Sequence, residues 1–160
     1  MAWSNSKVFG ALIEDVLQNT AAIDVSGGTP KIALYNNTTA PDETVTSANS
    51  AYAVDEWVVA NEVDDGTNWD TGGEPITSTT HARTGAAGSH VFTFDAADTP
   101  QGGATTTLAA VYGCLVYDDD LTTPVANQGY CYNYFGGVTS VTAGTYTIVW
   151  NASGIFSVSL

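Results

Sequence analysis

Basic residues are scarce in this sequence. Its 160 residues include three Lys plus Arg against 17 Asp plus Glu, which gives a formal net charge of −14 and a pI near 4.1. Such a charge repels the phosphates of nucleic acids and of anionic lipids. We therefore expect no nucleic acid and no membrane among its partners. Charged residues make up only 12% of the chain and hydrophobic residues 44%, which indicates a folded domain rather than a disordered acidic tail.

Long hydrophobic runs are also missing, since none approaches the roughly 18 apolar residues of a membrane span. Glu14 and Asp15 interrupt the apolar residues near the N-terminus, so we expect no export signal there and a protein made in the cytosol. Cysteine is rare: Cys114 and Cys131 are too few and too far apart for a zinc site. We predict two buried thiols, with a cross-strand disulfide as the alternative.

Catalytic motifs are absent from the sequence, which contains no GxSxG, no glycine-rich phosphate loop with a lysine and no HExxH. The run Asp118, Asp119 and Asp120 lacks the glycine and bidentate glutamate of a calcium loop and is predicted to be a solvated turn. His81 and His90 lie on different predicted strands, as edge or surface residues. We therefore predict no catalytic residue, no metal and no cofactor, although two carboxylates of a glycosidase need only meet in space.

The length fits a single domain, residues 1–160, which buries enough surface to fold without a disulfide or a metal. An amphipathic helix is predicted over about residues 5–19, with Ser4 or Asn5 as N-cap, a stop near Asn19, and Glu14 and Asp15 pointing away from its apolar stripe. Its apolar stripe, expected to pack on the sheet, consists of Val8, Phe9, Leu12, Ile13, Val16 and Leu17.

A β-rich body is predicted over about residues 22–160. Strands are expected at residues 22–25, 31–35, 76–83, 90–95, 105–117 and 126–135, with a short helix at 47–54 and an ambiguous segment at 56–63. Residues 145–150 and 155–160 are predicted to form a closing hairpin around a turn at 151–154, with Trp150 and Phe156 largely buried. This pattern predicts a mainly β fold, an antiparallel β-sandwich or barrel-like domain with one N-terminal amphipathic helix.

Aromatic residues are the one feature that suggests binding, because they dominate protein interfaces as well as cores. The candidate interface residues are Trp3, Trp57, Trp69, Tyr130, Tyr132 and Tyr134. Alternation along a strand would put the three tyrosines on one face, as a ladder. A neighbouring element could cover this ladder, or it could be an exposed sugar platform, and the sequence leaves both open.

Four phrases of the sequence resemble, in the same order, those of a group of small virion structural proteins of tailed bacteriophages. The phrases are KIALYNNTTAPD, HVFTFDAADTP, TTTLAAVYGCLVYDDDLTTP and TAGTYTIVWNASGIFSVSL. The resemblance covers nearly the whole chain, and the closing phrase, residues 143–160, is its most specific part. Residues 55–70 and 130–135 depart from the pattern. The resemblance implies a place in a particle and no chemistry.

The leading hypothesis is a capsid decoration (cement) protein on the outer shell, in a virion assembled in the host cytoplasm. Its partners would be the major capsid protein and copies of itself, for example as a trimer, held by apolar and main-chain contacts. The acidity fits the outside of a shell, because an outer protein needs no Lys or Arg to neutralise phosphates. The alternatives are a tail or tail-tip protein bound to tail proteins, a carbohydrate-binding adhesion module, and a hydrolase with spatially assembled carboxylates.

Overall fold

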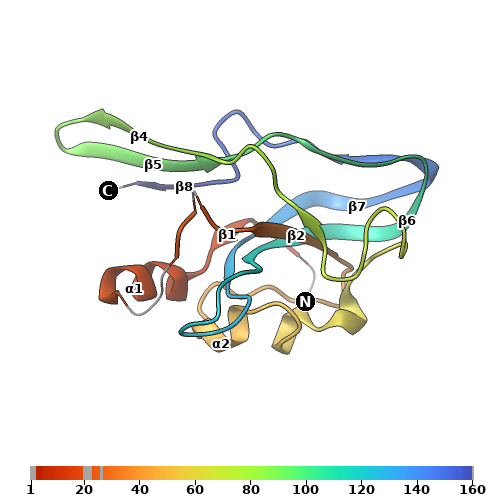
Figure 1. Ribbon diagram of the computed structural model, residues 1–160, viewed down its shortest axis with the longest axis horizontal. Coiled ribbons are helices and arrows are strands. Elements are labelled where there is room, and N and C mark those ends of the chain that lie inside the picture. The colour runs from red at the N-terminus through yellow and green to blue at the C-terminus, as the bar shows by residue number, and fades with distance from the viewer. Residues whose placement is uncertain (1–2, 20–22, 26, 160) are drawn as a thin grey trace.

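The computed structural model describes residues 3–19, 23–25 and 27–159 (Figure 1). Within these residues the fold is mainly β, with two antiparallel sheets, which confirms the predicted fold class and is consistent with a β-sandwich. The five-stranded sheet has the order β1 (Lys7–Val8), β7 (Gly129–Ile148), β6 (Thr99–Asp118), β2 (Pro30–Tyr35), β3 (Glu74–Pro75). The three-stranded sheet has the order β4 (Thr80–Ala86), β5 (Ser89–Asp95), β8 (Phe156–Ser159).

The long strands β6 and β7 connect the two layers of the molecule. Their pairing register shifts several times between Gln101 and Gly113, and β-bulges of this kind bend the strands that carry them. Figure 1 shows both strands turning back at the end opposite α1, so that their two halves lie in different layers. The bent ribbon therefore encloses part of the core by itself.

The N-terminal helix begins later than predicted. Lys7 and Val8 form β1, paired with Tyr132 and Cys131 of β7, and the Phe9 N–H donates to the Tyr130 carbonyl. These hydrogen bonds keep the chain extended, so Phe9 is the N-cap of α1 (Gly10–Gln18), and not Ser4 or Asn5. The predicted stop is confirmed, because Asn19 is the C-cap in the left-handed conformation.

Only part of the predicted apolar stripe of α1 reaches the core. Phe9 and Leu12 are buried and Ile13 is half-buried, but Val16 and Leu17 are 49% and 81% exposed. The expectation that the whole stripe packs on the sheet is therefore wrong at the C-terminal turn of the helix.

Asp15 points away from the apolar stripe, as predicted, and still has partners within the fold. Its carboxylate accepts hydrogen bonds from Ser47 Oγ and from Gln128 Nε2. These two bonds connect α1 to α2 and to the loop between β6 and β7. The helix is therefore anchored on its polar side as well as by Leu12.

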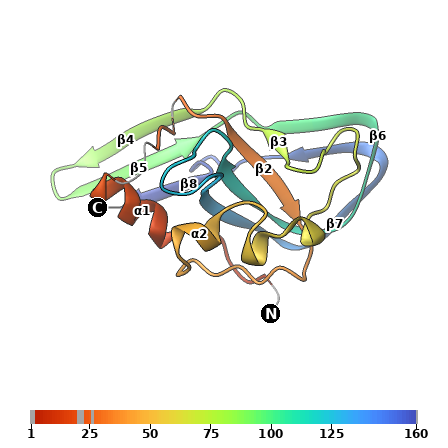
Figure 2. The same cartoon turned by 60° about the horizontal axis from the view of Figure 1, so that its bottom comes forward.

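Short helices cover one side of the five-stranded sheet. They are α2 (Ser47–Ser50), which confirms part of the predicted helix 47–54, and two 3-10 helices, η1 (Asp55–Trp57) and η2 (Val59–Asn61), in the segment that the sequence left ambiguous. Figure 2 shows α1, α2 and these helices in a row.

The strand predicted over residues 76–83 is observed later in the chain, as β4. Of the strand predicted at 22–25, residue 22 lies outside the described residues and residues 23–25 form no strand.

The two closing strands exist but do not pair with each other, so the predicted hairpin is wrong. Residues 145–148 end β7 and pair with β6, whereas β8 pairs with β5 in the other sheet. The turn at 151–154 is present, closed by a 2.8 Å bond from Gly154 N–H to the Asn151 carbonyl, and it carries the chain between sheets. Trp150 and Phe156 are half-buried, and Ile155 is the buried residue here.

Two groups of aromatic rings form much of the core. One group lies between the five-stranded sheet and the row of helices and consists of Trp3, Phe9, Tyr35, Trp57 and Tyr132, whose rings contact one another mostly edge to face. The other joins the sheets, where the rings of Phe94 and Tyr130 meet at 6.2 Å between centroids. Edge-to-face aromatic pairs each add about 0.5–1.5 kcal/mol beyond area burial.

Candidate functional site: an apolar surface at α1 and β8

The structure places the aromatic candidates mainly in the core. Trp3, Trp57, Trp69, Tyr130 and Tyr132 are each at most 4% exposed, and Tyr134 is half-buried. The Tyr130 ring contacts Phe94 of β5, while the Tyr132 ring joins the group around Trp57. The register between β6 and β7 shifts at Val116 and Tyr117, which interrupts the simple alternation assumed for a tyrosine ladder. The five buried side chains pack the core and offer no surface to a partner.

The acidic run after β6 is only partly a solvated turn. Asp118 is buried, and its carboxylate accepts from the Tyr130 hydroxyl at 2.6 Å and from the Asp120 N–H at 3.1 Å. Asp119 forms an ion pair with Lys31 at 2.9 Å. Among the described residues, no three His, Cys, Asp or Glu side chains gather in a way that could hold a metal ion. The run is therefore a structural turn with one internal acid.

Asp65 is held in a tight loop. Slight desolvation raises the pKa of its carboxyl, but hydrogen bonds from the N–H groups of Trp69, Asn68 and Thr67 outweigh this and bring the pKa well below its usual range. The bonds fix the loop before Trp69, whose ring packs on Tyr146. The segment with Asp64 and Asp65 is thus an ordered loop.

Glu62 is the acid whose environment most resembles that of a catalytic group. Burial raises the pKa of its carboxyl, although hydrogen bonds from the Tyr52 hydroxyl at 2.7 Å and the Gly72 N–H at 2.9 Å oppose this. The Tyr52 ring stacks on Tyr117 at 4.9 Å, and the Tyr117 hydroxyl donates to the Gly72 carbonyl. Both carboxylate oxygens already have partners inside the fold. Glu62 therefore serves to connect two loops to the sheet.

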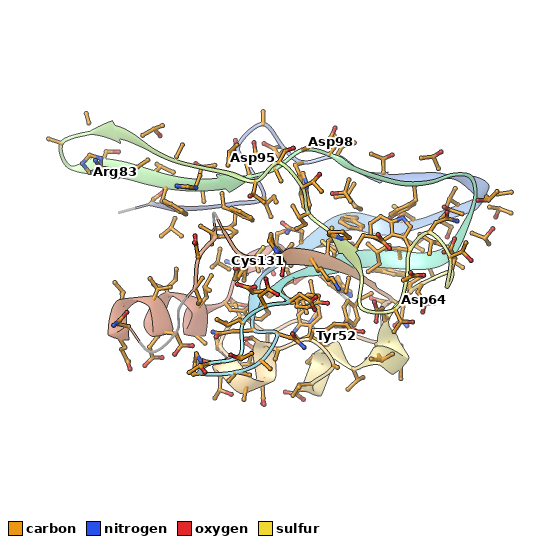
Figure 3. The ribbon with its side chains drawn as sticks, viewed as in Figure 1. Tyr52, Asp64, Arg83, Asp95, Asp98 and Cys131 are labelled. Atoms are coloured by element: carbon orange, nitrogen blue, oxygen red, sulfur yellow. The ribbon has the colours of Figure 1, made fainter. Side chains whose placement is uncertain are left out.

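The two thiols match their prediction. Cys114 and Cys131 are free and buried in the sheet, and Figure 3 shows Cys131 in the middle of the molecule. Burial raises the pKa of the Cys131 thiol to about 12 and that of Cys114 well above its usual range. His81 is exposed on the edge strand β4, as expected, whereas His90 is half-buried at the start of β5, which lies between β4 and β8. In the described part of the chain, no helix is long and apolar enough to cross a membrane.

An apolar slot lies between α1 and the three-stranded sheet. It has a volume of about 280 Å³ and is lined by Leu12, Ile13, Val16, Leu17, Ile23, Val25, Phe92, Phe156 and Val158. Figure 1 shows β5 and β8 projecting above α1, which places the slot at one end of the molecule. None of these lining residues is charged. An apolar lining without charged residues suits contact with another apolar surface.

A groove of about 480 Å³ continues from the slot along β8. Its walls are β1 with the preceding Ser6 on one side and residues 155–159 on the other, with Cys131, Tyr132 and Asn133 between them. Ile13, Phe156 and Val158 line both hollows. Among the described residues, β8 pairs with β5 on one side and with no strand on the other. We call the slot, the groove and this free edge the α1–β8 surface.

The α1–β8 surface was missed by the sequence analysis, although a signal was present. The apolar stripe on the helix is wider than one contact with a sheet can cover, and its last two members, Val16 and Leu17, remain exposed. The second signal, an uncharged Phe-Ser-Val-Ser strand at the end of the chain, was assigned to a hairpin.

Comparisons with protein-family models, with curated proteins and with solved structures found no match to this chain. Its function is therefore argued from the residues, from the resemblance described above and from the α1–β8 surface.

Proposed function

We propose that the chain is a non-enzymatic structural protein of a tailed-bacteriophage virion, and more narrowly a capsid decoration (cement) protein on the outer shell. The observation that carries this proposal is the α1–β8 surface. A chain with a formal charge of −14 keeps an apolar slot, lined by no charged residue among those described, next to an open strand edge. Such a surface supports attachment to protein through apolar and main-chain contacts.

The sequence resemblance supports the kind of assembly. Its most specific phrase, residues 143–160, includes the end of β7, the turn at 151–154 and β8. The phrase therefore supplies one edge of the α1–β8 surface as well as part of the fold. The acidic remainder of the chain supports an outer position, away from packaged DNA. In this proposal the major capsid protein is the main partner, and the protein becomes part of the virion in the host cytoplasm.

The tail or tail-tip alternative uses the same surface on a different partner. The adhesion-module alternative has less support, because the aromatic side chains that would form a sugar platform are buried. The hydrolase alternative is also less supported, since Glu62, whose carboxyl pKa is raised by burial, has both oxygens bonded within the fold.

Immunogold electron microscopy of intact particles tests the location. Antibodies raised against the purified chain should label the shell in many copies, and pre-immune serum should label nothing. Label confined to tails would replace the capsid role with the tail alternative. Particles that carry no label, in a preparation whose denatured proteins also give no band with the antibody, would overturn the virion role.

A further inference from the structure

We propose that two copies of this chain associate through the α1–β8 surface, in a pair related by a twofold axis, with the two β8 strands side by side. The three-stranded sheets of the two copies would then form one continuous sheet. This inference concerns the purified chain alone: in the free chain the second copy occupies the surface that the proposed function assigns to the capsid protein, and the two contacts exclude each other.

The edge formed by β8 is open and uncharged. An unpaired edge strand offers its N–H and C=O groups to another chain, and proteins usually block such edges with charged side chains. The opposite edge of the same sheet, β4, carries His81 and Arg83, and β1 carries Lys7, whereas β8 has the sequence Phe-Ser-Val-Ser. Of these edges, β8 is the one without a charged side chain to oppose pairing.

Apolar and polar side chains alternate along β8, and this alternation determines which register a twofold pair of β8 strands can adopt. Phe156 and Val158 line the slot, and Ser157 and Ser159 are exposed. Directly opposite residues in a sheet share a face, so an apolar residue must meet an apolar residue. The antiparallel register with Ser157 on the axis satisfies this requirement, because Phe156 then lies opposite Val158 of the second copy. The apolar face of one sheet continues into the other.

The helix adds apolar surface on the same side. Leu17 is 81% exposed and Val16 49%, and both line the slot together with Phe156 and Val158. Pairing at β8 brings the two slots to either side of the axis, where each copy supplies both an exposed leucine and a hollow. Burial of an exposed leucine or valine is the main source of affinity in such a contact.

The distribution of charged residues around the α1–β8 surface favours a second copy over a basic protein as the partner that binds there. Among the described residues that line the slot or the groove, Lys7 alone is charged. The acids of α1 lie on its other side, where Asp15 bonds to Ser47 and Gln128 and Glu14 faces the segment before α2. A basic protein would gain more from a hollow such as that of Asp42, Glu43 and Glu56. Two chains of charge −14 can meet with least repulsion where acids are missing.

The distribution of the other charges agrees with this arrangement. Figure 3 shows Arg83 at the outer end of the three-stranded sheet and Asp64 at the opposite end of the molecule. A pair joined at β8 would thus keep distant acids such as Asp64 far from the second copy. Repulsion between the remaining charges would act over long distances, and salt would screen it.

Sedimentation equilibrium of the purified chain, over a range of protein and sodium chloride concentrations, tests the proposal. We expect a monomer–dimer equilibrium in which dimer increases with protein concentration and with salt. Leu17→Glu should raise the dimer dissociation constant about tenfold or more, since it buries a charge in the contact. Ser157→Lys should also weaken the dimer, because two ammonium groups would face each other across the axis.

Val138→Glu is the matched control. Val138 is 57% exposed on β7 and lies outside the α1–β8 surface, and its replacement changes the net charge as Leu17→Glu does. Because Val138 and Leu17 are exposed, both variants should keep the circular dichroism spectrum and melting temperature of the parent. A monomer under all conditions, a trimer, or equal weakening by Leu17→Glu and Val138→Glu would overturn the proposal. So would a dimer that dissociates as salt is added.

Discussion

Neighbouring residues of α1 make very different contributions to stability, because the helix is only partly covered. Leu12 is 3% exposed, while Ile13 is half-buried. We expect Leu12→Ala to reduce the free energy of unfolding by about 2–5 kcal/mol, through lost burial and a cavity, and Ile13→Ala to reduce it by less. Val138→Ala, at an exposed site, is the control and should have a small effect. Urea unfolding measures all three, and an unchanged midpoint for Leu12→Ala would show that α1 is a detachable arm.

Glu62 should make stability depend on pH. Because burial raises the pKa of its carboxyl in the folded state, the folded chain binds more protons than the unfolded chain between the ordinary glutamate pKa and the raised one. Stability should therefore increase as pH falls through this window and become constant, for this group, below it. Glu62→Gln should remove this dependence and be at least as stable as the parent at neutral pH, since an amide carries no buried charge.

Urea unfolding at several pH values, from neutral to the ordinary glutamate pKa, measures this effect. The control is Glu14→Gln, which removes the same charge from an exposed position on α1. The pH dependence assigned to Glu62 should persist in this variant. Identical pH dependence of the parent and Glu62→Gln would contradict the assignment of Glu62 as a buried acid with a raised pKa.

At the scale of elements, β8 is needed to complete the three-stranded sheet. Deletion of residues 154–160 removes the strand that pairs with β5 and the buried Ile155, and leaves Phe94 and the edge of β5 exposed. We expect the truncated chain to be insoluble or to lose cooperative unfolding, because an open apolar edge aggregates. Soluble expression and a thermal melt measure this. A truncated chain that folds like the parent would mean that β8 is an arm donated to a neighbour.

For the whole molecule, the proposed attachment to the particle predicts a particular response to salt. Apolar and main-chain contacts persist or strengthen as salt rises, whereas ion pairs with basic capsid residues would weaken. The charge of −14 on each copy adds repulsion at low salt, where screening lengths reach tens of ångströms, and less above about 0.1 M, where they fall to about 10 Å. Binding to particles stripped of the protein should therefore hold or increase with sodium chloride. A steep loss of binding would contradict apolar attachment.

The sequence by itself determined the features that depend on local pattern and composition. The alternation of apolar residues predicted most of the strands, and the helical spacing and Asn19 predicted α1 and its end. Burial of Cys114 and Cys131 followed from their apolar surroundings. These features could be predicted because side-chain period and backbone preference act over a few residues.

Only the tertiary structure decided which strands pair and which apolar residues stay exposed. The alternation of side chains in a strand does not specify which strand it pairs with, so residues 145–148 and β8 were equally compatible with a hairpin. In the structure, residues 145–148 pair with β6, and β8 pairs with β5. In the same way, pairing of Lys7 and Val8 with β7 shortened α1. Leu17 and β8 became neighbours through contacts far apart in the chain. The α1–β8 surface is therefore a product of long-range packing, which local pattern does not encode.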